Sequence, residues 1–226
     1  MIVEILGLPG SGKTSIENKM RACNNSQDKI NFLNRRCTRR NGTLKICLFY
    51  IKLFFLYPKI ILNIKSSFWL LAKISLRLCH YKSHIKEELC VLSDTGILMP
   101  IISFIIQHNK YLYKVDLRRL ISSLSLPDVI VFIDSDINIV IDRYVNRGGV
   151  QTKGVGIRDV VTNNSELYEN FLLGFEALSD LKSILKEKKC AVIMINNNDS
   201  AKYNEIPAIL FHKLVSEFRL SQYAKQ

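Results

Sequence analysis

The sequence predicts an α/β fold in which a five-stranded parallel sheet carries helices on both faces. Three observations lead to this class: Val/Ile-rich runs alternate with longer stretches suited to helices, a glycine-rich turn follows the first run, and 48% of the 226 residues are apolar. Short apolar runs suit strands buried on both faces, and strands separated by helices pair in parallel through right-handed crossovers. The length fits a single domain, 1–226.

The individual elements follow from these runs. Four apolar runs and one weaker run, 29–33, predict strands at 2–6, 29–33, 89–93, 129–133 and 190–195. The stretches between them are long enough for crossover helices, which we expect at 13–22, 97–107, 117–125, 136–147, 163–188 and 204–220. Asp136 is of a residue type that caps helices, so it should start the fourth of these helices.

Residues 44–86 depart from this alternation and predict an apolar helical insertion. Lys45, Lys52 and Lys59 recur every seven residues, which places them on one helical face, and Pro58 divides the segment into two helices. A helix that crosses a membrane is excluded here, because lysine and proline near its middle would be costly in a bilayer.

Residues 7–14 form the motif G-x-x-x-x-G-K-[ST], directly after a strand and at the start of a helix. Its glycines allow turns that point backbone N–H groups inward, and the following helix adds its positive end. Such a nest holds a triphosphate, so we expect ATP and the fold of a P-loop NTPase. Lys13 should reach the β- and γ-phosphates, and the Thr14 hydroxyl should coordinate Mg²⁺. The residues expected to contact the nucleotide are Gly7, Leu8, Pro9, Gly10, Ser11, Gly12, Lys13, Thr14 and Ser15.

Asp94 follows the predicted strand at 89–93. Parallel strands present their carboxyl ends to the ligand crevice, so Asp94 should lie beside the phosphates. There it would act on Mg²⁺ through a bound water or accept a proton from an incoming hydroxyl. The alternative is that it caps the helix that starts near Ile97.

Two arginines are candidates for binding the phosphoryl group. Arg143 and Arg147 are four residues apart and share one helical face. They either form a solvated surface at the helix end or clamp the transferring phosphoryl group. Residues 147–158 contain four glycines and predict a lid that ends at Arg158. Residues 196–198, three asparagines after the last strand, either contact a purine base or form a turn.

The charge of the chain is concentrated in its first part. Residues 1–90 carry 16 Lys/Arg against 5 Asp/Glu, whereas the remainder carries 16 against 15. A basic half predicts an anionic partner. We do not expect nucleic acid, because no aromatic stacking pattern accompanies the charge. The lysine-striped insertion suits peripheral contact with an anionic membrane, the interface of a homodimer, or packing under the lid beside the acceptor.

Cysteine use and the first residues bear on location. The six cysteines form no C-x-x-C pair, which is typical of reduced thiols in a cytosolic protein. The chain opens directly into a strand-like run, so we expect no secretory signal. The expected location is cytoplasmic, with any membrane contact at the inner face.

Taken in order, four segments resemble the P-loop nucleoside and nucleotide kinases, in particular the thymidylate-kinase-like group. They are GLPGSGKT, the strand ending in Asp94, PDVIVFIDSD with IDRYVNRGG, and the helix NSELYENFLLGFEAL. The resemblance implies that Arg143, Arg147 and Arg158 contact ATP phosphates. Thr95-Gly96 stands where thymidylate kinases have an arginine that helps to bind the acceptor monophosphate, and the insertion falls in the acceptor-binding region. These departures predict a changed acceptor.

The expected function is therefore an ATP-dependent kinase that transfers the γ-phosphoryl group to a small acceptor, such as a nucleotide, nucleoside, sugar or related metabolite. The alternative is a regulatory module that binds nucleotide, hydrolyses it slowly and docks on a membrane or a partner. A GTP switch protein is not the expected class, because the sequence has no N-K-x-D base-reading motif.

Overall fold

The computed structural model describes residues 1–23, 30–32, 89–92, 96–107, 114–124, 126–146, 165–188, 190–198 and 205–223. Within these ranges one sheet is formed by β1 (Ile2–Leu6), β2 (Ile30–Phe32), β3 (Leu89–Leu92), β4 (Val129–Asp134) and β5 (Ala191–Asn196). The strand order is β2-β3-β1-β4-β5, and every neighbouring pair is parallel. The predicted five-stranded parallel sheet is confirmed, and the strand that leads into the glycine-rich turn lies at its centre.

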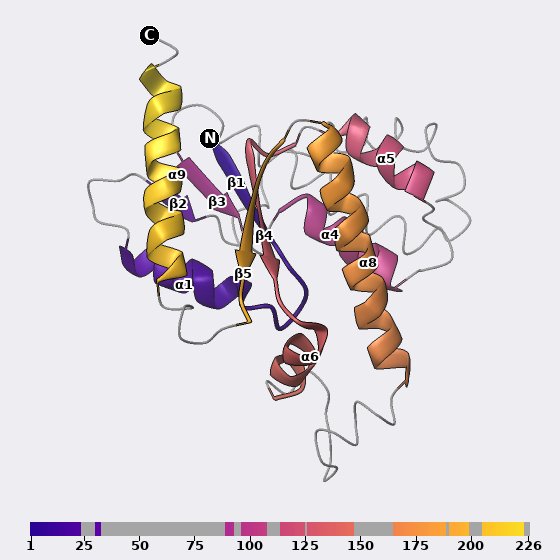
Figure 1. The fold of residues 1–226 in the computed structure, drawn as a ribbon. Coiled ribbons are helices and arrows are strands. Elements are labelled where there is room, and N and C mark those ends of the chain that lie inside the picture. The colour runs from indigo at the N-terminus through magenta and orange to yellow at the C-terminus, as the bar shows by residue number, and fades with distance from the viewer. Residues whose placement is uncertain are drawn as a thin grey trace, which may run out of the picture.

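Helices cover both faces of the sheet (Figure 1). The described helices are α1 (Lys13–Cys23), α4 (Leu98–Gln107), α5 (Lys114–Ser123), α6 (Ile137–Asn146), α8 (Ser165–Glu187) and α9 (Ile206–Tyr223). All lie where the sequence predicts helices, although α5 begins three residues earlier. No helix in the described part of the chain is both long and apolar enough to cross a bilayer. The predicted insertion at 44–86 and lid at 147–158 lie outside the described residues.

Two apolar cores lie on opposite sides of the sheet, because successive side chains of a strand point to opposite faces. Ile2 and Leu6 of β1 pack with residues from α4, α5, α6 and α8. Val3 and Ile5 pack with α1 and α9. All five residues of β1 are buried, which is what a central strand covered on both faces requires.

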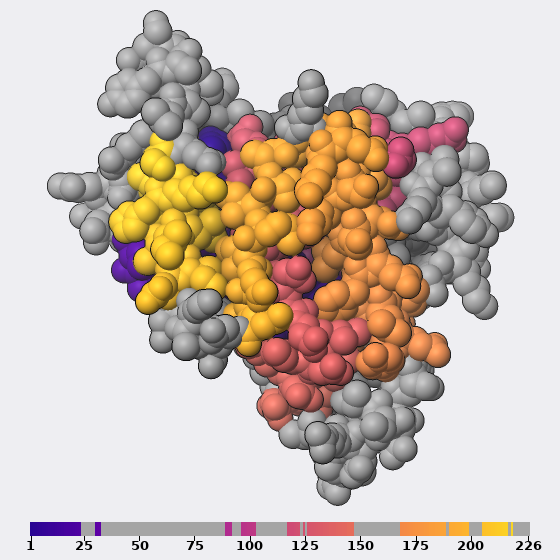
Figure 2. All heavy atoms as spheres, in the orientation of Figure 1, coloured from indigo at the N-terminus to yellow at the C-terminus, as the bar shows by residue number. Residues whose placement is uncertain are grey.

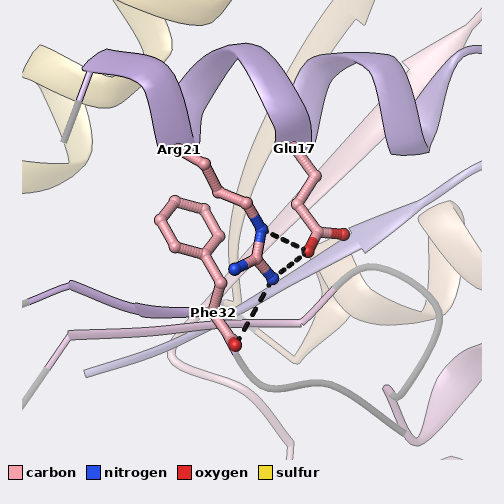
Figure 3. Close-up of polar contacts among 3 residues, drawn as sticks. All are labelled: Glu17, Arg21 and Phe32. Atoms are coloured by element: carbon pink, nitrogen blue, oxygen red, sulfur yellow. Dashed lines mark hydrogen bonds and ion pairs between the residues drawn. The ribbon is translucent and has the colours of Figure 1, made fainter.

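The edge strand β2 is joined to α1 through Arg21 (Figure 3). The guanidinium forms an ion pair with Glu17, one helical turn earlier, at 2.5 Å between Nη2 and Oε1. It also donates to the Phe32 carbonyl at 3.4 Å, and it lies 4.5 Å from the centre of the Phe32 ring. These exposed contacts hold the edge strand β2 against α1, and their contribution to stability is modest.

The strand order determines where a ligand can bind. The chain passes from β1 outward to β2, returns to β3, and then crosses to the other side for β4 and β5. In parallel sheets, ligands bind outside the carboxyl ends of the strands at the point where the order reverses. A ligand site is therefore expected at the carboxyl end of β1, between β3 and β4.

Candidate active site

The turn between β1 and α1 has a shape that its glycines dictate. Gly10 and Gly12 have φ angles of 90° and 97°, in the left-handed region that side chains rarely adopt. A Cβ atom on Gly10 would lie 2.3 Å from the carbonyl oxygen of Val140 on α6. The turn is thus pressed against α6, and Gly10 is the residue that allows this approach.

Lys13 is folded into the turn that precedes it. Its Nζ donates to the carbonyl oxygens of Gly7 at 2.6 Å and Leu8 at 3.0 Å, and the residue is only 8% exposed. A second bond inside the turn runs from the Ser11 N–H to the Leu8 carbonyl at 3.1 Å. Thr14 is exposed and Ser15 is half-buried, both in the first turn of α1. Residues 7–15, which are predicted to contact nucleotide, therefore lie together at the carboxyl end of the central strand.

Asn197 connects this turn to the other side of the sheet. It is 1% exposed, and its Nδ2 donates to the Ser11 carbonyl at 2.7 Å. Its N–H donates to the carbonyl of Asp134 at 2.8 Å, and its own carbonyl accepts a bond from Arg143 Nη1 at 3.3 Å. One buried residue after β5 thus ties the glycine-rich turn to β4 and α6.

Of the two roles that the sequence left open for residues 196–198, the structure shows the turn. The Asn198 N–H donates to Asn196 Oδ1 at 2.9 Å, and Asn198 Oδ1 accepts from the Asp136 N–H at 2.6 Å. The predicted cap of α6 is confirmed as well, because Asp136 Oδ1 accepts from the Asn138 N–H at 2.8 Å.

Arg143 is on α6, and its contact with Asn197 directs the guanidinium toward the end of β5. It is half-buried, so it is not the fully solvated residue that the simpler interpretation describes. Arg147, Arg158 and Asp94 lie outside the described residues. The flanks of Asp94 are described, with Leu92 ending β3 and Gly96 preceding α4.

Glu4 is a buried carboxylate that the sequence reasoning missed. It is fully buried in β1, and it accepts bonds from the N–H groups of Ile97 at 3.0 Å, Leu98 at 2.8 Å and Met99 at 3.4 Å. The carboxylate thereby caps the start of α4, the helix that follows the neighbouring strand β3 in the chain. The signal was available, because an acidic residue in the middle of a strand buried on both faces is unusual.

A cavity of about 200 Å³ lies between β5 and α8 and is bordered by the glycine-rich turn (Figure 2). Leu8 and Ser11 of the turn line it together with Phe132 of β4 and Phe175 of α8. Ligand pockets usually have volumes of roughly 300–1,000 Å³, so this space is small for a nucleotide or a nucleoside. We therefore do not assign either substrate to it.

Comparison with solved structures finds deoxyadenosine kinase from M. mycoides. Its complex with dATP matches with a TM-score of 0.52 at 15% identity, over 95% of this chain and 99% of that chain. Its complex with the products dCMP and a flexible dCDP gives 0.51 at 15% identity, over 96% and 100%. No protein-family model matches the chain, and no curated protein matches it.

The fold is that of a P-loop kinase. This confirms the predicted class of fold and the resemblance to P-loop kinases, although the matched structures are nucleoside kinases rather than thymidylate kinases. At 15% identity the likeness establishes the fold.

Proposed function

We propose that the chain is an ATP-dependent kinase that transfers the γ-phosphoryl group to a hydroxyl of a nucleoside. The observation that carries this proposal is Lys13, buried within a glycine-rich turn at the centre of a P-loop kinase sheet. The deoxyadenosine kinase that matches this fold has been solved with dATP and with the products dCMP and dCDP. The absence of an arginine directly after Asp94 favours an acceptor without a monophosphate.

The turn and the first residues of α1 fit the triphosphate of ATP. Residues 7–14 curve around the carboxyl end of β1, and the N-terminus of α1 favours negative charge there. Lys13 supplies a positive charge, and the exposed Thr14 hydroxyl is the group that would hold Mg²⁺. The metal ion, when bound, neutralises charge that develops on the phosphate oxygens.

The remaining roles follow the chemistry of transfer. The acceptor oxygen bonds to the γ-phosphorus as the bond to the β-phosphate oxygen breaks, and Asp94 takes the hydroxyl proton. Arg143, with Arg147 and Arg158, would stabilise the transferring group. We also propose a single domain over 1–226, with a lid at 147–158 and a helical insertion at 44–86.

Acceptor-dependent ADP formation from Mg·ATP tests the proposal, with nucleosides, nucleoside monophosphates and sugars as candidate acceptors. Turnover should be fastest with a nucleoside. Lys13→Ala should lower it roughly a hundredfold or more, and Asp94→Asn by ~10²-fold. Lys19→Ala removes the same charge from the same helix and should leave turnover unchanged. ADP release that does not depend on any acceptor, or normal turnover in Lys13→Ala, would refute the assignment.

A further inference from the structure

A buried side-chain amide holds one peptide of the glycine-rich turn. Asn197 follows β5 and is 1% exposed, and its Nδ2 donates to the Ser11 carbonyl at 2.7 Å. Its Oδ1 is also buried and has no hydrogen-bond partner in the described part of the chain. An unpartnered buried oxygen costs free energy, so packing alone would favour an apolar side chain of the same size. What the amide provides here is therefore the bond to Ser11.

The backbone of Asn197 is fixed independently of this bond. Its N–H donates to the Asp134 carbonyl at 2.8 Å, at the end of β4. Its carbonyl accepts from Arg143 Nη1 of α6 at 3.3 Å. The side chain thus reaches the turn from an anchored position. Because of this anchor, the Nδ2 group can hold the Ser11 carbonyl in place rather than move with it.

The Ser11 carbonyl belongs to the same peptide as the Gly12 N–H. This peptide is planar and trans, so the two groups point in opposite directions. The carbonyl points to the buried Asn197, and the Gly12 N–H therefore points to the opposite side of the turn. Gly12 has a φ of 97°, and glycine adopts positive and negative φ about equally readily. Gly12 itself therefore does little to prevent this peptide from turning over, whereas the Asn197 bond opposes it.

We propose that Asn197 is a positioning residue for ATP, which holds the Ser11–Gly12 peptide so that the Gly12 N–H faces the phosphates. This inference rests on the proposed function, because it takes the glycine-rich turn as the triphosphate site. With the peptide turned over, the Ser11 carbonyl oxygen would face the phosphates in place of the N–H, and the negative ends of both groups would repel each other. Asn197 acts through the turn and not through a contact of its own with ATP.

Two variants remove the Nδ2 donor in different ways. Asn197→Ala deletes atoms, and Asn197→Leu replaces the amide with an apolar group of similar size. The matched control is Asp128→Ala, because Asp128 Oδ2 accepts from the Ile2 N–H at 2.7 Å. The control thus loses a side-chain bond of the same length to the backbone, at the end of β1 that lies away from the turn. Comparison with this control separates a loss of stability from a loss of peptide orientation.

Calorimetric titration with Mg·ATP measures nucleotide affinity without an acceptor or turnover. In both Asn197 variants the Kd for Mg·ATP should rise by at least about tenfold, which is the effect of losing one hydrogen bond to a charged group. KM for the acceptor should change by less than about threefold, and the Gly12 amide resonance should shift in the nucleotide-free protein. Asp128→Ala should lower the melting temperature and change the Kd by less than about threefold. An unchanged Kd or an unshifted Gly12 resonance in both Asn197 variants would overturn the positioning role, as would an equal rise in Kd in the control.

The outcomes for the two proposals are separate. Wild-type protein that binds Mg·ATP without acceptor-dependent transfer refutes the kinase function, and the titrations still decide the role of Asn197. Wild-type turnover together with an unchanged Kd in the two Asn197 variants refutes only the positioning role. If Asn197→Leu fails to fold, Asn197→Ala alone decides, because the removal of atoms cannot crowd the surrounding residues.

Discussion

Gly10→Ala is the substitution that most directly tests how the glycine-rich turn is built. Gly10 combines a φ of 90° with close contact to α6, where an added Cβ would meet the Val140 carbonyl oxygen at 2.3 Å. The obstructing atom belongs to the backbone of a helix, so it cannot rotate away as a flexible side chain would. Alanine at this position must therefore strain the turn, displace α6, or both.

The expected loss of stability has two parts. A non-glycine residue held in an unfavourable backbone region costs about 1–3 kcal/mol. Carbon and oxygen atoms normally stay ~3.3 Å or more apart, so turn and helix must separate by about 1 Å, and such overpacking costs about 1–3 kcal/mol. Together these give at least about 2 kcal/mol. For a chain of this size that corresponds to a fall in melting temperature of at least roughly 4 °C.

Thermal unfolding and ATP kinetics measure the two consequences. The melting temperature should fall as stated, and kcat/KM for ATP should fall by roughly 10²-fold, because the turn moves relative to the bound triphosphate. Asn18→Ala, at an exposed position on α1, is the control and should change stability by less than about 0.5 kcal/mol. A Gly10→Ala variant with wild-type melting and wild-type kcat/KM would refute the reasoning.

Two further predictions concern the residues that brace the turn. Asn197→Leu leaves the Ser11 carbonyl without the Nδ2 donor seen at 2.7 Å, so the free energy of unfolding should fall by about 1–3 kcal/mol and KM for ATP should rise; unchanged urea denaturation would contradict this. Asp136→Ala removes the cap of α6 and should cost about 1 kcal/mol in the same urea assay, whereas Asp136→Ser should retain most of the stability; equal losses in the two variants would show that the cap bond is not the cause.

The sequence alone determined the elements of the fold. Val/Ile-rich runs marked most of the strands because a strand buried on both faces must be largely apolar, and β4 is the clearest case. The glycine-rich turn was equally legible, since Gly10, Gly12 and Lys13 lie within one short stretch whose spacing is fixed by local geometry. The Asp136 cap was predictable for the same reason, because its partner is only two residues away.

Tertiary structure decided the contacts between residues far apart in the chain. Glu4 and Ile97 are 93 residues apart, and Asn197 and Ser11 are 186 residues apart. No local sequence pattern predicts such a partner, because the pairing depends on which strands become neighbours in the sheet. The order β2-β3-β1-β4-β5 places β3 and β4 on either side of β1, and only then do the start of α4 and the end of β5 come within reach of the central strand and its turn.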